Sequence, residues 1–475
     1  MLLSPLLLAA CATALQPPEV APAVNANALA HWAHAEPLAA STGPDASALA
    51  HWWQQFDDPS LESLVRQALA ANLDMKIAQA NLRAAQAARA ATESGFSPVV
   101  GTSGSATRNT TRQTGNNTYR LSLNASWEPD LAGTQRAALT ASQADEQAAQ
   151  ADVAATQVSL SGELALAYLQ WRNAQARESI TRESLASLEQ TRQLAQWKAQ
   201  AGLASGLDVD QSRLAVEQTR ASLIALTDEI TSYEHTMALL LGLSPAQWKS
   251  QWQPPLSAGA GRVPQATAAL QRLAIGLPAD LLRRRPDLQA AEAQVRGAWA
   301  RTEQTRRAGF PGLSLTGSLG LQALTVGGLS SAGAGLATLA AAVDWTLFDA
   351  GARQAQVAQQ QALLDASRSS YDAAVLSAVK DVEDSLATLQ SGRARADALQ
   401  QAADAAGATL AGTQAQHQAG LTDFATLLEA QRNELSARLA LQSGATDVSL
   451  QLVRLYKALG GGWQATDTPR AAASS

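Results

Sequence analysis

Charged residues and large aromatic rings are scarce in this 475-residue chain, at 16% and 4% of the residues. An average globular protein has about 25% charged residues. The net charge of −6 leaves no basic face for nucleic acid. At the same time 46% of the residues are hydrophobic, which excludes a disordered chain because disorder needs low hydrophobicity and high net charge. The mean hydropathy of −0.10 argues against a polytopic helical membrane protein.

The chain has a single cysteine, Cys11, so an internal disulfide framework is impossible. Cys11 closes an apolar run that is too short to span a bilayer. The tetrapeptide Leu8-Ala9-Ala10-Cys11 resembles a bacterial lipobox, in which a signal peptide is cut before a cysteine that then carries lipid. We therefore expect residues 1–10 to be a lipoprotein signal peptide and Cys11 to be lipidated, and Ala12 favours passage to the outer membrane. The alternatives are a chance apolar start with a buried thiol, or a nucleophilic cysteine, for which no histidine stands in a suitable context.

The distribution of proline marks the organisation of the chain. Five prolines among small residues predict an extended, lipidated segment over residues 11–56. Its histidines show no metal-binding spacing on a helix, so no metal site is expected there. By contrast, no proline occurs between Asp130 and Ser244 or between Gly312 and Thr468.

Two of the proline-free stretches, residues 134–201 and 352–419, are rich in Ala, Gln, Leu and Arg, which are good helix formers. A continuous helix of about 68 residues would be about 100 Å long, at about 1.5 Å per residue. Ordinary globular domains do not use helices of that length, so the pattern predicts coiled-coil or tubular packing. Alanine on the contact faces would let neighbouring backbones approach closely.

Four other segments alternate apolar and polar residues with a period of two, as half-buried β-strands do. They are residues 99–107, 119–128, 313–321 and 337–345. We expect two hairpins, over about 97–129 and 310–348. The second lies in residues 308–343, which contain no charged residue and many glycines, and the glycines argue against a transmembrane helix. An uncharged alternating hairpin is typical of a transmembrane β-barrel. A hairpin that covers the core of a soluble protein would normally carry charged residues on its solvent-facing side.

Aromatic residues flank these strands. Phe96 and Phe310 precede the first strand of each hairpin, and Trp127 and Trp345 end the second strand. We expect all four rings at one level, as in the aromatic girdle at a membrane interface.

The two halves of the chain are internal repeats of one unit. A shift of 218 residues places the segment that begins at Trp127 on the segment that begins at Trp345, and Gln200 on Gln418. Each half is predicted to run helix, hairpin, long helix, tight turn, helix. The chain after residue 56 therefore divides into a first repeat, a linker, a second repeat and a flexible tail: residues 57–255, 256–280, 281–463 and 464–475.

Four strands cannot close a barrel. Membrane strands must close because unpaired backbone groups in hydrocarbon cost several kcal/mol each, and the smallest closed barrels have about eight strands. The chain must therefore oligomerise, and a cyclic trimer would supply twelve strands. The need for oligomerisation follows from this argument, whereas the number three does not.

Five motifs stand out along the chain: WWQQFDD, SWEPDL, LLRRRPDLQAAE, LFDAG and LYKALGGGW, beginning at residues 52, 126, 281, 347 and 455. From about Trp52 to Trp463 the sequence resembles the TolC-like outer-membrane efflux family, specifically its lipoprotein (NodT/OprM-type) branch. The third motif carries the strongest resemblance. Taken alone, its Pro286 and Asp287 are a plain signal for the start of a helix.

The resemblance implies an α+β membrane protein. Long helices would form a periplasmic α-barrel, and two β-hairpins, four strands per chain, would contribute to a trimeric twelve-stranded outer-membrane β-barrel. The implied partners of this homotrimer are outer-membrane lipid, a periplasmic adaptor protein and an inner-membrane resistance-nodulation-division transporter, with no nucleic acid and no cofactor. No HExxH, GxSxG or phosphate-loop motif is present, and a passive duct needs no catalytic residues, so an enzyme is not expected.

The resemblance also places function at the periplasmic tips of the long helices, where glycine permits the chain to reverse. The implied adaptor-contact residues in the two turns are Gly202, Leu203, Gly206, Gly420, Leu421 and Asp423. Beyond the second turn, family members narrow the tunnel with an apolar residue and an acid four positions later, which here are Ala425 and Glu429. Arg432 is placed to hold Glu429 in a closed arrangement. Ala425 is smaller than the usual apolar residue, and an ordinary surface pair of Glu429 and Arg432 is the alternative.

The leading functional prediction is the exit duct of a tripartite efflux pump. It would passively conduct drugs or other small toxic compounds from the periplasm to the exterior of a Gram-negative cell. An exit duct for type I protein secretion is the related alternative, although the lipobox and the triple glycine near Trp463 favour efflux. A non-transport structural lipoprotein of the periplasm would explain the long helices and Cys11 but not the uncharged, aromatic-bounded hairpins.

Overall fold

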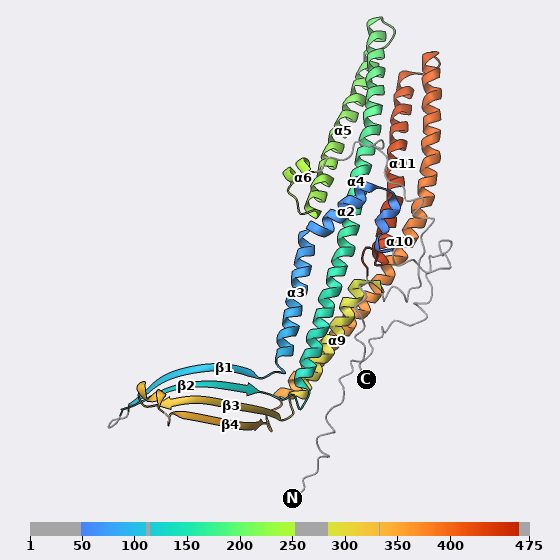
Figure 1. Ribbon diagram of the computed structural model, residues 1–475. Coiled ribbons are helices and arrows are strands. Elements are labelled where there is room, and N and C mark those ends of the chain that lie inside the picture. Colours follow the sequence, from blue (N-terminus) through green and yellow to red (C-terminus); the bar gives the residue numbers. More distant parts are fainter. Residues whose placement is uncertain (1–48, 111–114, 252–283, 332, 465–475) are drawn as a thin grey trace. The chain divides into compact units, whose positions relative to one another are not determined.

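The computed structural model describes residues 49–110, 115–251, 284–331 and 333–464 (Figure 1). Cys11, the linker over residues 256–280 and nearly all of the C-terminal tail therefore lie outside the described residues. Within the described residues, no helix combines the length and the apolarity that crossing a membrane would need.

Six helices form three pairs of equal length, one member from each half of the chain. The pairs contain 22, 67 and 35 residues per helix. They are α3 (Leu73–Ser94) with α9 (Pro286–Arg307), α4 (Thr134–Gln200) with α10 (Ala352–Gln418), and α5 (Gly206–Leu240) with α11 (Phe424–Ala458). The second and third pairs repeat with the 218-residue shift seen in the sequence, and α4 and α10 match the predicted long helices to within one residue.

The described residues also form four shorter helices: η3 (Trp52–Phe56), α2 (Pro59–Ala71), α6 (Pro245–Gln251) and η4 (Gly327–Ser330). Helix α2 starts at Pro59, and the carboxylate of Asp58 accepts hydrogen bonds from two backbone amides of its first turn. The sequence predicts an extended chain up to residue 56, whereas Trp52–Phe56 form a 3-10 helix. The reason is that Trp52, Trp53 and Phe56 are buried against the rest of the protein.

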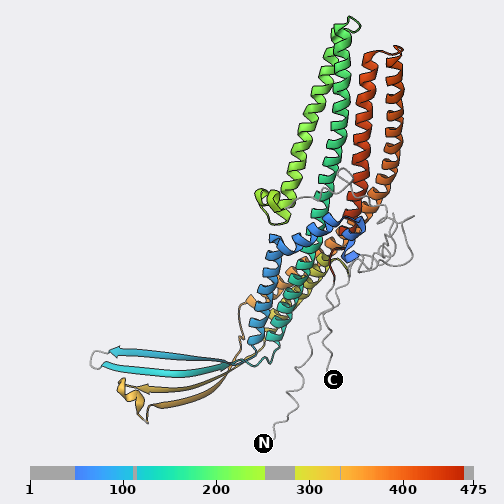
Figure 2. The same ribbon diagram turned by 45° about the horizontal axis from the view of Figure 1, so that its top comes forward.

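The two predicted hairpins are present and join into one antiparallel sheet with the order β1-β2-β3-β4 (Figures 1 and 2). The strands are β1 (Val99–Thr110), β2 (Gly115–Trp127), β3 (Gly312–Ala323) and β4 (Gly335–Asp344). The hairpins meet where β2 pairs with β3, from Trp127 opposite Leu315 to Tyr119 opposite Ala323. In the described chain β1 and β4 each have one strand neighbour, so both are edge strands.

The described chain folds as two compact units that cut across the sequence repeats. The first comprises residues 80–152 and 287–374, with both hairpins, and the second comprises residues 49–79, 153–251, 284–286 and 375–464. Each unit draws on both halves of the chain, because the duplicated segments pack against each other as well as within their own half. In the second unit α5 runs antiparallel to α4, and α11 runs antiparallel to α10 (Figure 2).

In the second unit the arginine–proline motif, Arg284-Arg285-Pro286, contacts the end of α11. Nη1 of Arg285 lies 3.3 Å from Oδ2 of Asp381 and donates to the carbonyl of the last residue of α11 at 3.2 Å. The indole of Trp463 donates to the carbonyl of Arg284 at 3.1 Å. Gly460 has a φ of +72°, and a Cβ there would lie 3.1 Å from that same carbonyl, so only glycine allows this approach. Arg284 and Arg285, in the motif that carries the strongest resemblance, thus contact the end of α11 and the residues that follow it.

Candidate functional sites at the helix turns and the strand ends

The turn between α4 and α5 is a tight reversal closed by side-chain caps. Gly202 takes up a left-handed conformation with a φ of +72°. Ser205 and Asp208 form a capping box, in which Ser205 Oγ accepts from the Asp208 amide at 3.2 Å and Asp208 Oδ2 accepts from the Ser205 amide at 3.0 Å. The predicted contact residue Gly206 is the first residue of α5.

The turn between α10 and α11 repeats this design. Gly420 has a φ of +71°, and Asp423 caps α11 by accepting from the Thr426 amide at 2.8 Å. The hydrogen bonds from Thr426 hold the pKa of the Asp423 carboxyl below its usual value. Leu203 in the first turn and Leu421 in the second are each 78% exposed. Each turn therefore presents one leucine side chain to solvent from a capped, well-defined loop.

A histidine connects the ends of α4 and α10. Nε2 of His417 lies 3.3 Å from Nζ of Lys198, and Nδ1 lies 3.3 Å from the carbonyl of Thr422. The imidazole also packs against the ring of Phe424, with the centroids 5.9 Å apart. His417 could not be singled out from the sequence, because a lone histidine near a helix end belongs to no motif.

The three predicted gate residues share one face of α11. Ala425, Glu429 and Arg432 are all exposed, and they follow one another at the four- and three-residue spacing of a helix face. Between Glu429 and Arg432 no ion pair forms in the described chain, so the expected pairing within one subunit is absent. Both charges face solvent on the single chain.

The opposite face of α11 packs against α4 and α5. Leu428 belongs to a buried cluster with Leu188 and Val216. Gln431 is buried as well, and its Nε2 donates to Oγ1 of Thr191 at 3.0 Å. The exposed gate face is therefore carried by a helix whose other face is fixed by apolar packing and a buried hydrogen bond.

The four predicted interfacial aromatics lie at one end of the sheet. The indole of Trp127 donates to the carbonyl of Phe96 at 2.9 Å, and the indole of Trp345 donates to the carbonyl of Gly309 at 3.2 Å. Trp127, Phe310 and Trp345 are exposed. The two hairpins thus place their tryptophans in equivalent positions, each bonded to the chain that enters its own hairpin.

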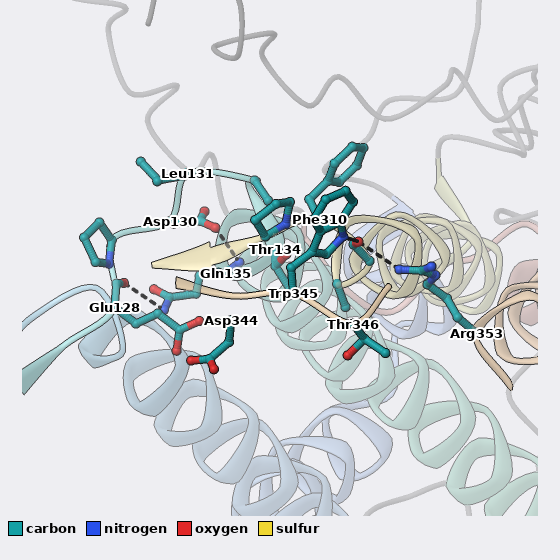
Figure 3. A pocket seen from close by; sticks show the side chains of 16 residues that line it. Glu128, Asp130, Leu131, Thr134, Gln135, Phe310, Asp344, Trp345, Thr346 and Arg353 are labelled. Carbon is teal, nitrogen blue, oxygen red and sulfur yellow. Dashed lines mark hydrogen bonds between the residues drawn. The ribbon is translucent and has the colours of Figure 1, made fainter. Parts of the chain in front are cut away.

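A cavity of about 420 Å³ lies beside these strand ends (Figure 3). Asp130 accepts from the amides of Gln135 and Arg136 at 3.1 and 3.0 Å, which caps the start of α4. Arg353 donates to the carbonyl of Gly309 at 2.8 Å, the same oxygen that accepts from the nearby indole. These hydrogen bonds fix the connections from strand to helix. No group of three or more His, Cys, Asp or Glu side chains that could hold a metal occurs among the described residues.

The sheet has two unlike faces, because residues directly opposite each other in paired strands point to the same side. The apolar face carries, among others, Val100, Leu121, Leu123, Leu315, Leu319 and Leu339. The polar face carries Ser103, Ser105, Ser122, Asn124, Thr316 and Ser318. Leu339 is 88% exposed, so the apolar face lacks a covering layer in the described chain. Alternation of this kind is typical of membrane barrels, whose outer surface contacts lipid and whose interior is polar.

Comparison with known proteins gives the context of these sites. The family model described as "Outer membrane efflux protein" matches residues 64–243 and 277–461. The antibiotic efflux pump outer membrane protein ArpC of Pseudomonas putida is 30% identical over 456 residues, which cover 93% of this chain and 91% of that protein. Among solved structures, the outer-membrane channel OprN matches with a TM-score of 0.84 and 32% identity, covering 95% of this chain and 99% of that one. CusC, described as forming a transmembrane channel, matches with a TM-score of 0.78 and 25% identity over 90% of this chain and 96% of that one.

Proposed function

Because the chain belongs to the outer membrane efflux protein family, we propose that it is the homotrimeric exit duct of a tripartite pump. Family membership makes it an outer-membrane efflux channel with the TolC-like fold, and not an enzyme, as predicted from the sequence. The partners in the proposed pump are a periplasmic adaptor and an inner-membrane resistance-nodulation-division transporter. The similarity to an antibiotic efflux pump protein supports antibiotics and other small toxic compounds as the cargo, rather than secreted proteins.

The observation that carries a closed oligomer is the four-stranded sheet with an exposed apolar face and two edge strands. In hydrocarbon each unpaired backbone group costs several kcal/mol, so both edges need partners. Pairing β4 of one subunit with β1 of the next would satisfy both edges and build a closed barrel from identical chains. Three chains would give twelve strands.

Cysteine cross-linking between the edge strands tests this arrangement. We would combine Thr102→Cys on β1 with a cysteine at Ala337, Leu339 or Ala341 on β4, all on the apolar face. Oxidation should give covalent dimers and trimers for at least one combination, with no larger species. A cysteine pair placed directly opposite on β2 and β3, such as Leu123→Cys with Leu319→Cys, is the control and should cross-link only within one chain. Monomers alone, or a largest cross-linked species with a number of subunits other than three, would contradict the closed trimer.

The remaining features support the other elements of the proposed duct. The exposed leucines of the two turns, Leu203 and Leu421, support contact with the adaptor. The exposed tryptophans support the proposal that these strand ends lie at the periplasmic surface of the outer membrane, where the barrel meets water. Lipidation of Cys11 would add an anchor, and the mass of the mature N-terminal peptide measures it directly.

For the gate, we propose that Glu429 of one subunit pairs with Arg432 of the next around the closed tip. Neither side chain has a partner within the described chain, and both lie on the exposed face of α11 together with Ala425. Exposed pairs contribute about 0.2–1 kcal/mol each, so a ring of three would bias the duct toward closure without locking it. Such a weak seal suits a channel that an adaptor has to open.

Removing the charge at Glu429 should therefore raise the resting conductance of the purified channel in a planar bilayer. The loss of three weak pairs predicts an increase on the order of tenfold. Asp397→Asn is the matched control, because Asp397 is an exposed acid on α10 away from the turn, and it should leave the conductance unchanged. Equal conductance of the Glu429→Gln variant and the wild type would remove Glu429 from the gate.

A further inference from the structure

The polar face of the sheet carries one charged side chain away from the strand ends. Of the described strand residues on this face, only Arg120 and Asp344 are charged, and Asp344 is the last residue of β4. Arg120 lies in β2, seven residues before Trp127, which corresponds to about 23 Å along the strand. The neighbours of Arg120 on this face are uncharged, among them Ser105, Ser122 and Asn124.

The guanidinium of Arg120 is held in place by the adjacent strand. Arg120 is directly opposite Gln322 of β3, and its Nε and Nη2 donate to Gln322 Oε1 at 3.2 and 2.5 Å. A neutral amide oxygen orients the arginine without neutralising it, since no carboxylate takes part in this contact. The full positive charge therefore stays on the polar face. Ser105, the opposite residue on β1, is also neutral.

We propose that Arg120 shifts the charge selectivity of the barrel toward anions and away from cations. This inference rests on the proposed trimer, in which the polar faces line the water-filled interior and three copies of Arg120 lie at one level. Rings of like charge in a pore attract ions of the opposite sign and repel those of the same sign. The cargo class that the barrel favours is accordingly anionic or neutral, and cationic solutes are disfavoured at this level.

The expected size of the effect follows from Coulomb's law with screening. At 0.1 M salt the Debye length is about 10 Å, so the arginines act on ions that pass within roughly that distance. Three charges in water at about that distance raise the local concentration of anions roughly twofold and lower that of cations roughly twofold. The ratio of anion to cation permeability therefore changes by roughly fourfold. The effect should weaken as the salt concentration rises, because screening increases.

Reversal potentials across a planar bilayer in a KCl gradient test the proposal, and they do not depend on how many channels are open. Arg120→Gln should lower the chloride-to-potassium permeability ratio by roughly fourfold, and Arg120→Glu should lower it further. Arg120→Lys, which keeps the charge, should retain the wild-type ratio. The matched control is Arg108→Gln, because Arg108 is an arginine of β1 on the apolar face, and this variant should also retain the wild-type ratio.

The outcomes separate this inference from the proposed duct. Conducting channels with the same permeability ratio in the wild type and in Arg120→Gln would overturn the role of Arg120 and leave the duct intact. An equal shift in Arg108→Gln would overturn it too, because the effect would then not depend on the polar face. A wild-type protein that forms no conducting channel would overturn the duct and the Arg120 assignment together.

Discussion

Replacing Trp52 with alanine is expected to lower the free energy of unfolding of the second unit by about 3–5 kcal/mol. The side chain of Trp52 is 0% exposed and stacks on the ring of Tyr456, with the centroids 5.4 Å apart and an interplanar angle of 16°. Trp53 and Phe56 pack edge-on against the same indole. The truncation therefore removes a large ring from the centre of an aromatic cluster and leaves a cavity.

Thermal unfolding of the detergent-solubilised protein, followed by its helical circular dichroism signal, measures this loss. Trp52→Phe should be milder, because the indole Nε1 of Trp52 has no hydrogen-bond partner among the described residues and only packing is lost. Trp197→Ala is the matched control, since Trp197 lies on α4 and is 57% exposed. Similar midpoints for Trp52→Ala and Trp197→Ala would mean that the aromatic cluster does not stabilise the fold.

The second large effect is expected at alkaline pH, where stability should fall steeply above about pH 10. Burial raises the pKa of the Tyr168 and Tyr456 hydroxyls, and for Tyr168 the hydrogen bond to the Asp58 carboxylate, 2.7 Å long, raises it further. A folded-state pKa above the unfolded value means that the stabilisation is complete below the unfolded pKa and is lost as the pH rises above it. Each tyrosine contributes a loss of about 1.4 kcal/mol per pH unit, so the two together contribute about 2.7 kcal/mol per unit.

Chemical denaturation at a series of pH values between about 9 and 11.5 checks this dependence. Tyr168→Phe and Tyr456→Phe should each reduce the slope by about 1.4 kcal/mol per pH unit, because phenylalanine has no proton to lose. The hydroxyl of Tyr456 donates to Oε1 of Gln55 at 2.6 Å, so both tyrosines bond the chain around η3 and α2. A slope that is the same in the wild type and in the double variant would show that other groups cause the alkaline loss.

The long helices and the hairpins could be predicted because their signals are local. Helix propensity, absence of proline and a period of two are properties of neighbouring residues, and they located α4 and α10 to within one residue and all four strands. The conformation of the last residues before residue 57 was predicted wrongly, as extended, whereas Trp52–Phe56 form a 3-10 helix. Its conformation depends on burial of Trp52 against Tyr456, and that part of the chain bonds to a residue 401 positions away.

For the candidate sites, the sequence identified many of the residues but not the contacts between them. The turn glycines, the gate residues and the strand-end aromatics were named from the sequence and from its resemblance to a family. Their roles in gating, adaptor contact and the membrane interface remain proposals. The contact between His417 and Lys198 could not be named, because 219 residues separate them and no motif joins them. The same holds for Arg120 and Gln322, which are 202 residues apart.

The amino-acid sequence determines the repeated order of helix and hairpin and the lack of charge in residues 308–343, since these follow from patterns within short windows. It also determines the need for more than one chain, because four strands cannot close a membrane barrel. The tertiary structure decides how the two halves combine. It places β2 beside β3, so that both hairpins form one sheet with a polar and an apolar face. It also sets Gly460 against the arginine–proline motif, where only a residue without a Cβ fits. These contacts join residues far apart in the chain, and packing and hydrogen bonding between distant segments become visible only when the chain is folded.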